Sequence, residues 1–414
     1  VRIVDQPLQT SWRRPVIWAG IPLIIGAVNE FAISAALPQI RSDLGLQIHQ
    51  MRWMIMVFLI ADAVVLVAAG RLGDRVGRRP VLMVGLAVLT IGSVAAAVSP
   101  DYGWLLLARG VEGVGAGMMF SGVLAIVTDV APPAMLGRAF GLWALVGAFG
   151  VLLSPIVGGA LAHYASWRWI LIAHAVLSLI ALLLTPLFLS SDKPEASSPH
   201  SMRRMLGSAN FVSGTAIVTL IYATMSLTFF TLTFYLHTVE GLNARDVGLV
   251  FGAYGLFWLV LPPFTGRLAD RLGVRVPLLI GLGLVFVGML GLSISAGGAS
   301  LPATITGLAV AAIGVSFVIP AANSAAFGHL HPEDRGEASG LNMTVRLIGS
   351  ILGVATATFL LESISGTSIP QIGVAGGLDD AAMWIWRLGA LVSLIAFAVT
   401  LAGIRTPGKS AVAA

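Results

Sequence analysis

Long apolar segments alternate with short polar segments along the whole chain. Each apolar segment has roughly the 20 residues that an α-helix needs to cross a membrane. The segments are too long and too uniformly apolar for strands, and a helix pairs its own backbone polar groups inside lipid. The twelve segments lie near 16–38, 51–70, 80–98, 103–128, 137–162, 167–189, 209–236, 246–265, 276–296, 301–326, 338–363 and 382–404. The pattern therefore predicts an all-α membrane protein with twelve transmembrane helices.

A charged ten-residue segment occurs twice. Residues 70–79 read GRLGDRVGRR, residues 266–275 read GRLADRLGVR, and each copy is expected to form a tight loop between two membrane helices. Because the copies hold the same place in two sets of six segments, we predict two pseudo-symmetric halves, 1–189 and 208–414. The polar, Pro- and Ser-rich segment 190–207 is the expected cytoplasmic linker. Duplicated halves with a binding site between them are typical of secondary transporters.

Composition supports a membrane protein. The chain is 57% hydrophobic and only 10% charged, with a mean hydropathy of +0.93, whereas a soluble domain carries roughly 25% charged residues. The absence of cysteine excludes disulfides and thiolate metal sites. We expect no metal, no cofactor and no enzymatic activity, because no nucleotide-binding loop or catalytic constellation is found. The expected partners are the lipid bilayer, a small-molecule substrate and protons, and the protein is expected to be a monomer.

The basic residues indicate an orientation. Most of the 24 Lys and Arg residues lie at the two termini or in segments on one side of the predicted membrane. By the positive-inside rule both termini are then cytoplasmic, in a membrane that we expect to be a bacterial inner membrane. The net charge of +5 therefore reflects topology rather than a nucleic-acid partner.

Ionisable side chains inside membrane helices are costly and are presumed to be functional. Glu30 in the first segment and Glu112 in the fourth lie at a similar estimated depth, and Arg109 lies one turn from Glu112. A carboxyl group that is desolvated in a membrane has a raised pKa, which a nearby arginine lowers again. We therefore predict that Glu30, Arg109 and Glu112 couple proton movement to transport. The alternative is a static Arg109–Glu112 pair, because residues at i and i+3 share a helix face, with Glu30 as the only titrating site.

The roles of two other charged residues inside the segments, Asp62 and Arg346, each have two possible interpretations. Asp62 is either a further proton-relay or substrate-cation site or a structural hydrogen-bond partner. His174 is interpreted as a helix-packing residue. Arg346, one turn after Asn342, either holds an anionic group of the substrate or bridges backbone carbonyls. The second half offers only arginines within its segments, so proton handling is expected in the first half.

The repeated segments are candidates for a gate. Their glycines allow a tight turn, and Asp74 could meet a helix N-terminus or an arginine of a neighbouring helix. Such a cluster can lock the two halves together in one state and release them in another, and the alternative is that it only fixes topology. The predicted gating residues are Gly70, Asp74, Arg75, Gly77 and Arg78, with Asp270 and Arg271 in the second copy.

Several motifs resemble those of the major facilitator superfamily, and more narrowly its drug/proton antiporter branch. Residues 70–79 resemble the loop between its helices two and three. Residues 106–116, LLARGVEGVGA, resemble its fourth-helix motif, with Glu112 where glutamine is usual. Residues 36–38, ALP, resemble the first-helix motif of the fourteen-helix drug exporters, with Asn29 where aspartate is common. This chain has twelve predicted helices instead.

Residues 150–159, GVLLSPIVGG, resemble the fifth-helix antiporter motif, with Ser154 replacing a glycine. The resemblance implies that Gly150, Pro155, Gly158 and Gly159 form a seal against proton leak and a pivot. The proline also removes a backbone hydrogen bond and is expected to bend the helix. Ordinary glycine-mediated helix packing is the alternative.

A substrate cavity between the halves should be apolar with few polar groups. Methionine and aromatic side chains on the fourth and seventh segments adapt to many apolar ligands. The predicted cavity residues are Asn29, Met118, Met119, Phe120, Tyr222, Met225, Phe229, Phe230, Asn342 and Arg346. The sequence thus predicts proton-coupled export of small amphipathic compounds. A transporter of a specific metabolite, sugar or lipid, and a non-transporting membrane receptor, remain alternatives.

Overall fold

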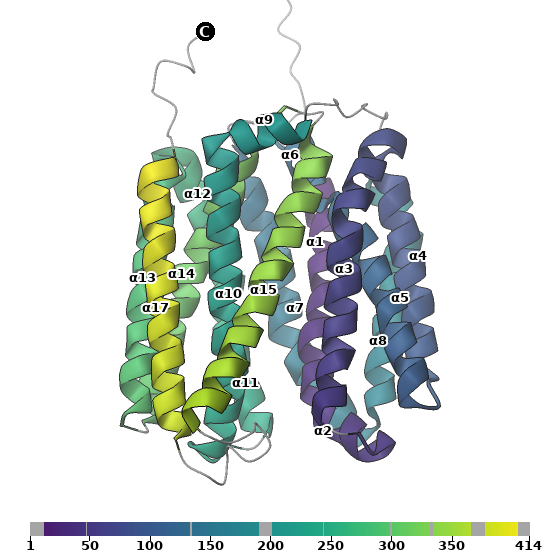
Figure 1. Ribbon diagram of the computed structural model, residues 1–414. Helices are drawn as coiled ribbons and strands as arrows, with labels where there is room; N and C mark the ends of the chain where they lie inside the picture. The colour runs from purple at the N-terminus through teal and green to yellow at the C-terminus, as the bar shows by residue number, and fades with distance from the viewer. Residues whose placement is uncertain are drawn as a thin grey trace, which may run out of the picture.

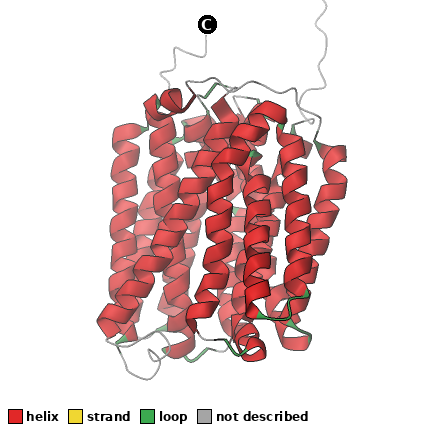
Figure 2. Ribbon diagram, turned by 45° about the vertical axis from the view of Figure 1, so that its right-hand side comes forward, coloured by secondary structure: helices red, strands yellow, loops and turns green. Residues whose placement is uncertain are grey.

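The computed structural model describes residues 12–46, 48–132, 135–189, 201–242, 244–298, 300–328, 330–331, 334–365 and 377–404. Nearly all of them are helical (Figure 2). The first part of the chain forms α1 (Arg13–Ala27), the π-helix η1 (Val28–Ala32), α2 (Ile33–Leu44), α3 (Ile48–Val76), α4 (Arg78–Ala97), α5 (Tyr102–Ser121), α6 (Val123–Val130), α7 (Leu136–Tyr164) and α8 (Trp167–Phe188). The second part forms α9 (Ser201–Gly207), α10 (Ala209–Thr238), α11 (Ala244–Val260), α12 (Pro262–Leu272), α13 (Arg275–Ala296), α14 (Leu301–Phe327), α15 (Arg335–Ser365) and α17 (Leu378–Gly403).

The prediction of a helical membrane protein is confirmed. Among the described residues, 11 helical stretches are long and apolar enough to cross a membrane. The predicted first segment corresponds to α1, η1 and α2, which follow one another without a gap. A π-helical turn interrupts this segment at Asn29 and Glu30, and such turns are frequent at functional sites.

The repeated segments were expected to be loops, and this expectation is wrong for most of their residues. Helix α3 continues to Val76 and α4 begins at Arg78, so that only Gly77, with φ of 97°, lies between them. In the second copy, Gly273, with φ of 80°, follows the last residue of α12. A glycine with positive φ ends a helix within one residue, so the charged residues before it stay helical. Part of the predicted linker is also helical, as α9, and residues 190–200 lie outside the described part of the chain.

Most of the helices run side by side from one end of the bundle to the other (Figure 1). We call the end that carries α9, Gly77 and Gly273 the charged end, and the end that carries α2 the opposite end. Helices α1 to α8 lie together on one side, and α10 to α17 lie together on the other. Helix α3 packs against α15, and α7 packs against α11 and α12, so these pairs join the two groups.

Candidate functional site

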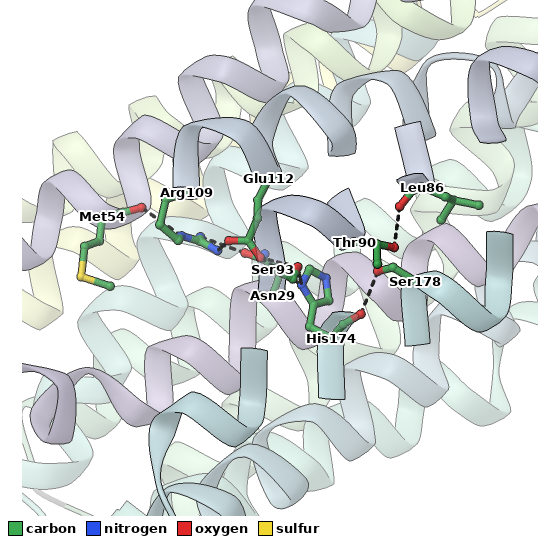
Figure 3. A network of polar contacts seen from close by, with 9 residues as sticks. All are labelled: Asn29, Met54, Leu86, Thr90, Ser93, Arg109, Glu112, His174 and Ser178. Atoms are coloured by element: carbon green, nitrogen blue, oxygen red, sulfur yellow. Dashed lines mark hydrogen bonds and ion pairs between the residues drawn. The ribbon is translucent and has the colours of Figure 1, made fainter. Parts of the chain in front are cut away.

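A buried polar network surrounds Arg109 (Figure 3). Its Nη1 donates to Oε2 of Glu112 at 2.8 Å, and its Nη2 donates to Oδ1 of Asn29 at 2.9 Å. Its Nε donates to the carbonyl oxygen of Met54 at 3.4 Å, and its guanidinium lies 4.6 Å from the ring centre of Phe58. Arg109 is 2% exposed and Glu112 is 0% exposed. Because an unpaired buried charge is costly, these contacts hold the two charges together.

The other carboxylate oxygen of Glu112 faces α4 and α8. The Ser93 hydroxyl donates to Oε1 of Glu112 at 2.6 Å, and Nδ1 of His174 lies 3.3 Å from the same oxygen. Nε2 of His174 is buried and has no hydrogen-bond partner among the described residues. Gly92 makes the arrangement possible, because a Cβ there would lie 2.8 Å from the backbone nitrogen of Glu112. Helices α4 and α5 therefore approach closely where Ser93 and Glu112 meet.

Sequence reasoning found only part of this network. It paired Arg109 with Glu112, but it assigned Asn29 to the substrate cavity and missed Ser93. It also interpreted His174 as a packing residue, whereas the structure places this side chain against Glu112. The side chain of Glu30 lies outside the described part of the structure, although its backbone lies in η1. Asp62 is 2% exposed on α3.

Asp74 joins the two groups of helices at the charged end. Its Oδ2 accepts the backbone N–H of Glu337 at 3.1 Å, in the first turn of α15. Its Oδ1 lies 3.5 Å from a nitrogen of Arg78. Asp74 thus contacts both kinds of group that the sequence suggested, a helix N-terminus and an arginine. A carboxylate in this position satisfies a free backbone N–H and interacts favourably with the helix dipole.

Further ion pairs surround this contact. Arg71 of α3 donates to Oε1 of Glu337 at 2.7 Å. Asp129, in the last turn of α6, pairs with Arg78 and accepts a hydrogen bond from Arg335 at 2.8 Å. Since α3 and α6 belong to the first group of helices and α15 to the second, the Arg71–Glu337 and Asp129–Arg335 pairs cross between the groups, whereas the Arg78–Asp129 pair lies within the first group.

Asp270 makes the equivalent contact in the other direction. Its carboxylate accepts the backbone N–H groups of Gly137 at 2.8 Å and Arg138 at 3.2 Å, at the start of α7. The helices touch here, because a Cβ at Gly266 would lie 2.2 Å from the carbonyl oxygen of Gly137. The two carboxylates of the repeat therefore each bind the N-terminus of a helix from the other group.

The remaining gating candidates lie near these contacts. Gly70 is buried within α3. Arg75 and Arg271 are exposed in the last turns of α3 and α12, and the structure shows no ion pair for either within the described residues.

The glycines of the fifth-helix motif pack against the first span. A Cβ at Gly150 would lie 2.7 Å from Cα of Ile24, and one at Gly158 would lie 2.5 Å from Cβ of Ala32. Close helix packing is thus what these two glycines permit in this structure. Helix α7 runs without interruption through Pro155 and Gly159, whose surroundings lie outside the described part.

The predicted cavity residues lie in different places. Tyr222 accepts a hydrogen bond from Nη1 of Arg346 at 3.3 Å, and Phe120 of α5 lies near the same guanidinium. Asn342 donates to Thr215 at 3.0 Å. Met225 and Phe229 line a small cavity between α10, α11, α13 and α14.

Three other predicted cavity residues lie in or beside hydrophobic cores. Met119 is 1% exposed and belongs to the core between α4 and α5, and Met118 is half-buried one residue before it. Phe230 packs edge-to-face against Phe234, with ring centres 5.2 Å apart, beside a separate core cluster of α10, α15 and α17. The methionine and aromatic pattern did not separate these core positions from positions between the helix groups.

Comparison with known proteins identifies the class. Residues 21–354 match the Major Facilitator Superfamily, and the chain belongs to this family. It is an integral multi-pass membrane protein and a transporter rather than an enzyme. The fold is similar to that of the proton:xylose symporter XylE, with a TM-score of 0.80 at 13% identity over 96% of this chain and 97% of that one.

Similar curated proteins include several bacterial transporters. The multidrug resistance protein Stp of Mycobacterium tuberculosis is 25% identical over 421 residues, covering 86% of this chain and 77% of Stp. The tetracenomycin C resistance and export protein of Streptomyces glaucescens is 22% identical, covering 87% and 80%. The riboflavin transporter RibZ of Clostridioides difficile is also 22% identical, covering 83% and 87%.

Proposed function

We propose that this protein exports small amphipathic compounds in exchange for protons, by alternating access across a bacterial plasma membrane. The charged end faces the cytoplasm in this proposal, with both termini on that side. The observation that carries the proposal is the buried network of Arg109, Glu112, Asn29 and His174 inside the first group of helices. Ionisable groups at this depth are retained where protons or ions are handled. The names of Stp and of the tetracenomycin C exporter support export rather than import.

The geometry supports different roles for the two acids, Glu30 and Glu112. Glu112 is paired with Arg109 and shared with Ser93 and His174, so its carboxylate is already stabilised. Glu30 lies in the π-helical turn directly after Asn29, which is bound to Arg109. A movement of the first span at this turn changes the position of Glu30 relative to Arg109. Proton binding at Glu30 is then linked to the conformation of the first group, and Glu112 keeps Arg109 in place.

The contacts at the charged end provide the second element of alternating access. Asp74 and Asp270 close this end by binding helices of the opposite group. Opening it requires both carboxylates to release those helix N-termini. The substrate then enters from the cytoplasmic side and is released after the charged end closes again.

Dye efflux from proteoliposomes with an imposed pH gradient tests this function. The parent is expected to drive uphill efflux that a protonophore abolishes. Glu30→Gln is expected to abolish uphill efflux, whereas Glu362→Gln, which changes an exposed acid near the end of α15, serves as the matched control. Uphill efflux by Glu30→Gln at the parent's rate would contradict the assignment of Glu30 as the proton-binding residue. Uphill efflux by the parent at the same rate with and without the protonophore would contradict proton coupling.

A transporter of one specific metabolite is the second candidate, and the similarity to the riboflavin transporter RibZ favours it. The same vesicles therefore also receive riboflavin, sugars and amino acids in place of the dye. Transport of one of these compounds without dye efflux would replace the export proposal. A lack of any transport would favour a non-transporting receptor with this fold.

A further inference from the structure

Arg346 lies where the two groups of helices face each other. It is 11 residues from the start of α15, or about 16 Å along the helix axis, which is roughly the middle of a membrane. Its guanidinium carbon lies 4.8 Å from the ring centre of Tyr222 on α10 and 5.7 Å from that of Phe120 on α5. Residues of both groups therefore contact one arginine at mid-depth.

The charge of Arg346 has no carboxylate partner within the described part of the structure. Its one side-chain hydrogen bond goes to the neutral hydroxyl of Tyr222, and its buried Nε has no partner. By contrast, Arg109 at a similar depth pairs with Glu112. A cation inside a membrane protein is costly unless an anion compensates it, so Arg346 is suited to bind an anion that is not part of the chain.

A surface of two aromatic side chains and one methionine extends from Arg346 along α10. Tyr222, Met225 and Phe229 share one helix face, because they are three and four residues apart. All three are half-buried, and the ring centre of Phe229 lies 4.8 Å from that of Tyr254 on α11. The face is about 10 Å long from Tyr222 to Phe229, which matches the length of a bicyclic aromatic ring system.

We propose that the transported compounds are amphipathic organic anions, with the anionic group bound by Arg346 and the aromatic body packed against Tyr222, Met225 and Phe229. Guanidinium binds carboxylate and similar oxyanions through two parallel hydrogen bonds, and Tyr222 and Phe120 hold its plane in position. This assignment rests on the proposed export function, because it names the substrate class of that transporter. The substrate's negative charge supplies the counter-ion that the described residues do not provide at Arg346.

Binding to the purified full-length protein at fixed pH tests the assignment without a gradient. The probes are 2-naphthalenesulfonate and a naphthyl-trimethylammonium ion, which share one aromatic body and carry permanent opposite charges. The parent is expected to bind the sulfonate at least about tenfold more tightly than the ammonium, as a charge-assisted contact implies. Equal binding, or tighter binding of the ammonium, would overturn the proposal.

Variants then locate the anion site. Arg346→Gln is expected to remove the preference for the sulfonate, and Arg346→Lys to keep the preference with weaker binding. Arg387→Gln is the matched control, because Arg387 also lies within a membrane helix but contacts Ser293 and Trp384 instead. An unchanged preference in folded Arg346→Gln, or the same loss in Arg387→Gln, would overturn the assignment. If Arg346→Gln does not fold, Arg346→Lys is the deciding variant. Because lysine keeps the positive charge, loss of the preference for the sulfonate in Arg346→Lys would then overturn the assignment.

The two proposals fail in different ways. If the parent prefers the sulfonate but a pH gradient drives no transport of it, the export mechanism is wrong and the anion site stands. If the gradient drives efflux of the ammonium and not of the sulfonate, proton-coupled export stands and the anion site is wrong.

Discussion

Replacing Asp74 with asparagine should open the charged end. The carboxylate accepts the N–H of Glu337 at 3.1 Å and faces Arg78 at 3.5 Å, and its side chain is 2% exposed. Hydrogen bonds to charged groups contribute about 1.5–3 kcal/mol, and asparagine keeps one acceptor oxygen, so we take the lower value. A loss of about 1.5 kcal/mol from the closed state raises the ratio of open to closed molecules roughly tenfold.

A single cysteine reports this change, since the parent contains none. Ser339→Cys is nearly isosteric, and Ser339 is 0% exposed next to Gly340, whose backbone lies against Leu66 of α3. A membrane-impermeant maleimide applied at the charged end should label this cysteine about tenfold faster when Asp74→Asn is added, because the ratio of open to closed molecules controls access. Transport should fall in the same variant.

Asp270→Asn is the matched comparison and should have the smaller effect on both labelling and transport. Asp270 binds two backbone N–H groups, but its ion-pair partner Arg138 is 40% exposed, and exposed pairs contribute little. The ion-pair partner of Asp74, in contrast, is Arg78, which is only 10% exposed. Equal losses for the two variants, with no change in labelling, would refute the reasoning and reduce the repeated segments to a role in topology and folding.

Three further variants test the remaining contacts. Arg109→Ala should weaken transport and move its pH optimum upward, and a superimposable pH profile would make Arg109 structural. Gly266→Val should prevent closure of the charged end and speed maleimide labelling of the cysteine at position 339, as Asp74→Asn does, because a Cβ at Gly266 would lie 2.2 Å from a backbone oxygen. Gly283→Val is the control and should change neither, because a Cβ at Gly283 would have open space around it. The double variant Asn29→Asp/Glu112→Gln keeps one carboxylate beside Arg109, because the new aspartate replaces the lost glutamate. It should therefore transport faster than either single variant. If the transport losses of the two single variants simply add in the double variant, the two residues do not share the role of partner to Arg109.

The helices could be predicted from the sequence because their apolar runs are long and are separated by charged residues. The ends of α3 and α12 could not, since one glycine at positive φ ends each helix, and the charged residues before it remain helical. In the network, Arg109 and Glu112 were predictable as an i, i+3 pair on one helix. Ser93 and His174 are 19 and 62 residues away from Glu112, so only the packing of α4 against α5 and of α8 against α4 brings them to it.

Arg109 and Arg346, the arginines near the middle of the membrane, differ in what compensates their charge. Arg109 is paired with Glu112 within the first group, so its charge is compensated without a bound substrate. Arg346 in the second group contacts the rings of Tyr222 and Phe120 and the hydroxyl of Tyr222, and it forms no ion pair with a carboxylate among the described residues. In the proposed anion site the substrate supplies the compensating charge, and because Phe120 of the first group also contacts Arg346, a substrate bound there would contact both groups.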